Sequence, residues 1–60
     1  MSVEAMVQGM IDDLTEAMAD AGKHDGGNSA AGTRVRKAMQ SAKAAAQAIR
    51  LKVQSDKNSR

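Results

Sequence analysis

The 60-residue sequence contains no cysteine, no proline and no aromatic residue. Without cysteine no disulfide can form, and a single histidine, His24, cannot assemble a zinc site by itself. Without proline, and with alanine as the commonest residue, the chain favours helix throughout. Without Phe, Tyr or Trp the apolar core has to be built from small or flexible side chains, so it is thin. A domain of this size is marginal on its own core, and we therefore expect self-association.

Long apolar runs are also missing. The longest apolar stretch is too short to cross a membrane or to form the core of a signal peptide. Binding at a membrane surface is disfavoured as well, because the first half is acidic and the second is rich in alanine rather than Trp, Phe or Leu. The absence of cysteine fits an intracellular location. We predict a cytoplasmic protein without a membrane partner.

Charge is divided unevenly along the chain, although the net charge is only +2. Residues 1–27 carry six acidic side chains against Lys23, which gives −5. Residues 28–60 carry eight basic side chains against Asp56, which gives +7. This asymmetry is more informative about partners than the sum is.

Two segments carry the alternating steps of four and three residues that are typical of packed helices. In the first half the apolar row is Val3, Val7, Met10, Leu14, Ala17 and Ala21. In the second half it is Val35, Met39, Ala42, Ala46, Ile49 and Val53. Ser2 is a good N-cap, Gly22 suits a C-terminal cap, and GKHDGGN has the composition of a turn.

These patterns predict an all-α fold, a coiled-coil-like antiparallel two-helix hairpin. We expect one domain, residues 1–54, made of a helix over 3–21, a turn over 22–28 and a helix over 29–54. A frayed C-terminal tail over 55–60 follows it. Aligning the two rows places Leu14 near Val35, Met10 near Met39, and Asp13 near Arg36.

That alignment leaves the second helix without a partner beyond Gln47. A shallow apolar stripe also lies on its far side. Together these features predict an oligomer interface, in a dimer or a four-helix bundle, formed by Ala44, Ala48, Ile49, Leu51 and Val53.

The stretch GGNSAAGTRVRKAMQ, residues 26–40, places three cations near a helix N-terminus, where the helix dipole favours negative charge. The compensation comes from a neighbouring acidic helix, from a phosphate backbone, or from both. Farther along the helix, basic side chains recur every seven residues and share one side. A cationic strip without aromatics suits phosphate contact rather than base stacking, but a solvated face is the plain alternative. The candidate DNA-binding residues are Arg34, Arg36, Lys37, Lys43, Arg50, Lys52 and Lys57.

The segment GNSAAGTRVRKA, residues 27–38, resembles bacterial linker-histone-like proteins, the chlamydial histone-like family, and AAAQAIR, residues 44–50, echoes its continuation. The resemblance implies a small nucleoid-associated protein that binds and compacts double-stranded DNA with little sequence preference. The bases that match are Arg34, Arg36 and Lys37. The family's lysine- and alanine-rich continuation is not seen in these residues. That difference keeps open a second function, a helical oligomerisation or protein-interaction module without significant DNA binding.

Other chemistry finds little support in the sequence. His24 beside Asp25 is either a base or ligand, or simply a solvated loop histidine. Asp12, Asp13 and Glu16 either bind a cation or only make the surface soluble. The serines lack an activating partner, and the glycines do not match a phosphate loop. We predict a protein that is not an enzyme and takes no cofactor, metal or small-molecule substrate.

Overall fold

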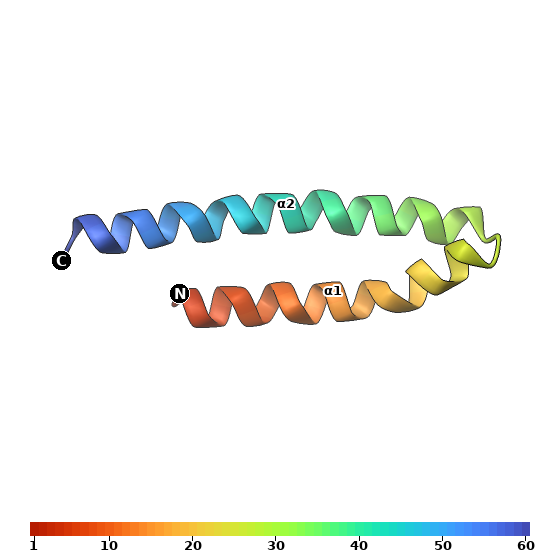
Figure 1. Cartoon of the computed structure of the whole chain (residues 1–60), viewed down its shortest axis with the longest axis horizontal. Helices are drawn as coiled ribbons and strands as arrows, with labels where there is room; N and C mark the ends of the chain where they lie inside the picture. The colour runs from red at the N-terminus through yellow and green to blue at the C-terminus, as the bar shows by residue number, and fades with distance from the viewer.

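The computed structural model describes all 60 residues and consists of two antiparallel α-helices joined at one end by a short turn (Figure 1). Helix α1 spans Val3–Asp25 and helix α2 spans Ser29–Asn58. No strand is present and the two helices pack against each other, so the predicted all-α hairpin is confirmed. No stretch of either helix has the length and apolar character that a membrane crossing needs.

Side-chain caps fix where both helices begin. The Ser2 hydroxyl accepts a hydrogen bond from the Ala5 amide at 3.1 Å, and the Asn28 side-chain oxygen accepts one from the Ala31 amide at 3.0 Å. Each cap satisfies one of the amides that have no partner in the first helical turn. Between the helices, Gly27 adopts φ = 102°, a conformation that favours glycine.

Both helices run past the ends that we expected. Helix α1 continues through Gly22 to Asp25, and α2 continues to Asn58 instead of ending at residue 54. The left-handed residue that reverses the chain is Gly27, so Gly22 stays helical. Lys23 and His24 then lie in the last turn of α1, where positive charge is favourable to the dipole.

The longer α1 shifts the register between the helices. Ala17 shares a groove with Ala38, and Met10 shares one with Ala45. The proximities that we expected for Met10 with Met39 and for Asp13 with Arg36 are therefore wrong. The pairing is set by a turn centred on Gly27, farther along the chain than the expected turn.

Helix α2 presents mainly alanine to α1. Its contact row, as we call the residues that face α1, is formed by Ala31, Val35, Ala38, Ala42, Ala45 and Ile49. Met39, which we expected in this row, is 46% exposed and lies to one side. Small side chains let two helices approach closely, and that approach explains why alanine occupies the row.

The side of α1 that meets α2 follows the expected row with one exchange. Its half-buried apolar residues are Val3, Met6, Met10, Leu14, Ala17 and Ala21. Met6 takes the place of Val7, which is 39% exposed. Ala31 is the single fully buried residue of the chain. The hairpin therefore has a contact seam and no true core.

Candidate nucleic-acid interface

Four basic side chains form one row along α2, each seven residues after the previous one. This basic row consists of Arg36, Lys43, Arg50 and Lys57. Seven residues correspond to about 10.5 Å along a helix, so the row is about 30 Å long. No member of the row has an acidic partner within 4.0 Å, and Arg50 only donates to the Gln47 side chain at 3.4 Å. The row is therefore a line of uncompensated positive charge.

The remaining candidate bases differ in whether they are paired. Lys37 has no acidic partner, whereas Arg34 pairs with Asp20 and Lys52 pairs with Asp56 one turn farther along α2. The charges of Arg34 and Lys52 are thus already partly neutralised by carboxylates of the same chain.

The pair between Arg34 and Asp20 joins the two helices. The Arg34 Nε atom donates to the Asp20 carboxylate at 3.0 Å, and a terminal guanidinium nitrogen lies 2.9 Å from the same oxygen. This hydrogen bond lowers the pKa of Asp20 below its usual 3.8, a shift that desolvation opposes and the charges of Arg34 and Lys23 support. The same contact raises the pKa of Arg34. One of the three cations near the start of α2 is therefore compensated by the acidic helix.

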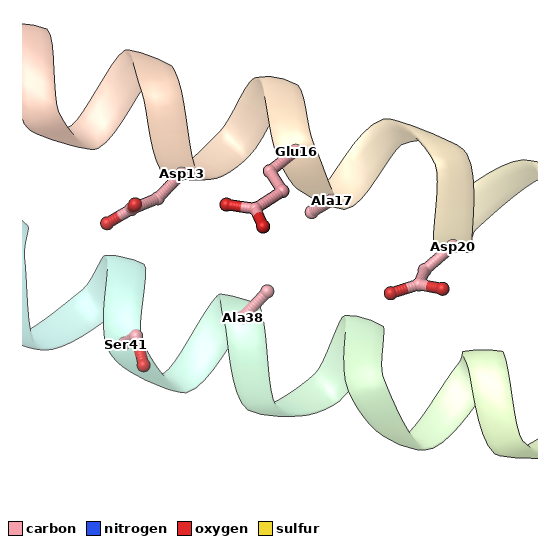
Figure 2. Close-up of a pocket in the computed structure, with 6 residues that line it drawn as sticks. All are labelled: Asp13, Glu16, Ala17, Asp20, Ala38 and Ser41. Carbon is pink, nitrogen blue, oxygen red and sulfur yellow. The ribbon is translucent and has the colours of Figure 1, made fainter.

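An acidic groove lies between the helices beside this pair. In Figure 2 the carboxylates of Asp13, Glu16 and Asp20 point from α1 toward Ala38 and Ser41 of α2, and Ala17 completes the lining. Three carboxylates in one groove repel a phosphate backbone. This part of the hairpin is thus unsuited to DNA.

The acidic groove and the basic row occupy opposite faces of the hairpin. Successive residues of an α-helix turn by about 100°, so Arg34 and Ser41 lie on one side of the α2 contact row, and Arg36 and Lys43 on the other. Arg34 and Ser41 face the acidic side chains of α1. One face of the hairpin is therefore basic and can attract anions, whereas the opposite face is acidic and can attract cations.

His24 has a structural contact at the turn. Its imidazole lies against Gly32 so closely that a Cβ atom on residue 32 would collide with the ring. A shallow depression beside it is lined by His24, Ser29, Gly32, Thr33, Val35 and Arg36. No group of three or more His, Cys, Asp or Glu side chains is placed to hold a metal ion.

Sequence reasoning missed the partners of the bases. Asp20 and Arg34 are equally far from Gly27, so the pair follows once Gly27 is taken as the centre of the turn. The turn predicted from the sequence, residues 22–28, is centred nearer the N-terminus than Gly27. The register that follows from it wrongly places Asp13 beside Arg36. The sequence offers two glycines, Gly22 and Gly27, at which the chain could reverse. Placing the reversal at Gly27 predicts the observed pair.

The fold and the site thus define a small all-α hairpin with one acidic and one basic face. The family model of the histone H1-like protein Hc1 matches residues 4–59, and the chain belongs to this family. The resemblance predicted from residues 27–38 is thus confirmed over nearly the whole chain. The family is one of structural DNA-binding, nucleoid-associated proteins rather than enzymes. No curated protein and no solved structure matches the chain.

Proposed function

We propose that the protein binds double-stranded DNA through the phosphate backbone, without sequence preference, and that associated copies bridge or compact it within the nucleoid. The observation that carries this proposal is the basic row of α2, whose four side chains have no acidic partner. Membership in the histone H1-like family supports it.

The dimensions of the row suit a phosphate backbone. The length of the basic row, about 30 Å, is close to one turn of B-DNA, about 34–36 Å. Each basic side chain of the row can therefore reach a different phosphate. The sequence has no aromatic residue to stack on bases. The row is made of Arg and Lys side chains on a single helix, and contacts to phosphate alone carry no sequence information.

The pairing within the hairpin ranks the candidate residues. Arg36, Lys37, Lys43, Arg50 and Lys57 supply free charge. Arg34 and Lys52 contribute less, because each would have to exchange a carboxylate for a phosphate. This ranking separates residues that look equivalent in the sequence.

The salt dependence of DNA binding tests the proposal. Each neutralised phosphate contributes about −0.9 to the slope of log K against log salt. The double variant Lys43→Gln with Arg50→Gln is expected to flatten that slope by up to about 2 units. The double variant Arg34→Gln with Lys52→Gln removes the same formal charge from paired positions, and it should flatten the slope less. Circular dichroism checks that both variants keep their helicity.

Two results would contradict the proposal. Wild-type protein that fails to shift unrelated duplexes at low salt would leave the helical interaction module as the function. Affinity that differs strongly between unrelated DNA sequences would overturn backbone-only recognition.

The interaction module has its own support in the structure. Several large apolar side chains remain exposed on the hairpin, which suits contact with another protein. In that case the charged faces would select the partner, and DNA contact would be incidental.

A further inference from the structure

Helix α1 carries a second apolar row, of which α2 covers only Leu14 in part. It consists of Val7, Ile11, Leu14 and Met18, spaced by four, three and four residues. Leu14 is half-buried in the hairpin, whereas Val7, Ile11 and Met18 are 39%, 50% and 70% exposed. This spacing is that of the d and a positions of a heptad repeat, the pattern by which one helix packs on another. The second row is therefore a helix-packing surface without a partner.

The hairpin exposes more surface area than a compact monomer of its mass does. A folded monomer of 6.3 kDa is expected to expose about 3,700 Å². This chain exposes 4702 Å², roughly 1,000 Å² more. A standard protein interface buries about 800 Å² on each partner. The excess is thus of the size that one interface with a partner removes.

The charges of α1 leave the second row free to meet an identical row. With Ile11 and Met18 at the a positions, the flanking e positions are Gln8 and Thr15 and the g positions are Met10 and Ala17. None of these flanking side chains is charged, although this half of the chain has a net charge of −5 from six acids and Lys23. The acids Asp12, Asp13 and Glu16 project at the b, c and f positions instead. Two acidic helices can therefore pack along residues 7–18 without like charges meeting in that stretch, and Glu4, at the a position before Val7, lies at its end.

We propose that two copies of this chain dimerise through the second row, α1 of one copy against α1 of the other. Ile at an a position followed by Leu at d also favours a two-stranded arrangement. The interface is independent of DNA binding, although bridging of DNA by the proposed function needs such an assembly.

The basic row sets the direction of the two α1 helices. On α1 the second row lies on the side of the contact seam away from Asp13 and Asp20, so it shares a face of the hairpin with the basic row. If the α1 helices ran antiparallel, the two hairpins would stack and their basic rows would face each other. A parallel pair about a two-fold axis places the two α2 helices on opposite sides. The dimer therefore has parallel α1 helices and two separate basic rows.

The stripe that the sequence suggested as an interface is a weaker surface. Ile49 shares a groove with Met6, so it does not overhang as we expected, and Val53 is half-buried. The remaining members are Ala44, Ala48 and Leu51. They supply one large apolar side chain, whereas the second row of α1 supplies four. A matched substitution can thus distinguish the two surfaces.

Sedimentation equilibrium without DNA tests the interface. Ile11→Gln should raise the dimer dissociation constant by about 10- to 100-fold, because each dimer loses two apolar side chains from the seam. Leu51→Gln, a similar change on the far side of α2, should leave it within about 3-fold. A wild-type chain that stays monomeric at millimolar concentration overturns the proposal. So does a Leu51→Gln effect as large as that of Ile11→Gln.

Disulfide trapping tests the direction. Because the chain has no cysteine, a single introduced thiol is a unique probe. Met18→Cys should oxidise to a covalent dimer, since parallel helices place equivalent a positions side by side. Gln40→Cys, exposed on α2, should remain a monomer. Efficient disulfide formation between Val7→Cys and Met18→Cys chains, with none within the Met18→Cys protein, would show antiparallel helices and overturn the parallel dimer. None of these measurements involves DNA. The dimer proposal can therefore be contradicted without contradicting the proposed DNA binding, and the reverse also holds.

Discussion

Glycine has opposite roles at two positions of this chain. Gly27 holds φ = 102°, where a side chain is strained, whereas Gly9 lies within α1 and a Cβ atom there would meet nothing within 4 Å. Gly9→Ala is therefore expected to stabilise the protein by about 0.5–1 kcal/mol, since it lowers the entropy of the unfolded chain. Gly27→Ala should destabilise it by about 1–2 kcal/mol. Urea denaturation at one fixed protein concentration measures both, and shifts of the same sign would contradict this account.

Asp20 links stability to pH. Its pKa is lowered in the folded state below the unfolded value of 3.8, chiefly by the hydrogen bond from Arg34. The stabilisation is therefore complete above pH 3.8 and is lost as the pH falls below it through the lowered pKa. Asp20→Asn should remove this part of the acid-induced loss of helicity. A variant whose acid profile below pH 4 parallels that of the wild type would contradict the assignment.

At the scale of the helix, the contact row of α2 depends on small side chains. Ala31 is fully buried against α1, whereas Ala48 is exposed. Ala31→Leu should force the helices apart and destabilise the hairpin by about 1–3 kcal/mol. Ala48→Leu, the same change on the outer surface, should stay within about 0.5 kcal/mol. Thermal melts followed by circular dichroism compare the two, and equal effects would show that the row is not closely packed.

The existence and type of both helices could be predicted from their apolar spacing and from the absence of proline. The row that α2 uses could not, because its alanines occur on several sides of the helix. Met39 outranks Ala38 in hydrophobicity, but close approach favours the smaller residue. The register failed for a related reason. Gly22 and Gly27 are both acceptable helix-terminating residues, and only the packing distinguishes them.

The sequence shows which basic side chains are candidates for the interface, but it does not show which of them are paired. The seven-residue spacing of the basic row is visible in the sequence. Whether a base is already paired depends on the register, as with Arg34 and Asp20. Likewise, the second row of α1 becomes significant only once α2 is seen to leave it open. Both features depend on how the two helices pack together, so they cannot be predicted from the residue pattern of either helix alone.

For the whole molecule, stability should depend on concentration. The hairpin is elongated, 50 × 15 × 13 Å, and has a single fully buried residue. If dimerisation supplies the missing burial, the melting temperature rises with protein concentration. Melts over a hundredfold range of concentration, followed by circular dichroism, measure the shift. A melting temperature that stays constant over this range would indicate that the isolated hairpin is stable by itself.

Helix α2 is longer than α1 and projects beyond its start, as Figure 1 shows. The last turns of α2 thus have hydrogen bonds within their own helix but no neighbouring helix to hold them closed. Such turns open more often than the paired region, so their amides exchange with solvent fastest and trypsin should cut first after Lys57. Lys57 also belongs to the basic row. Bound DNA would therefore slow both exchange and cleavage at this end, which makes the most weakly held part of the protein the most sensitive reporter of its ligand.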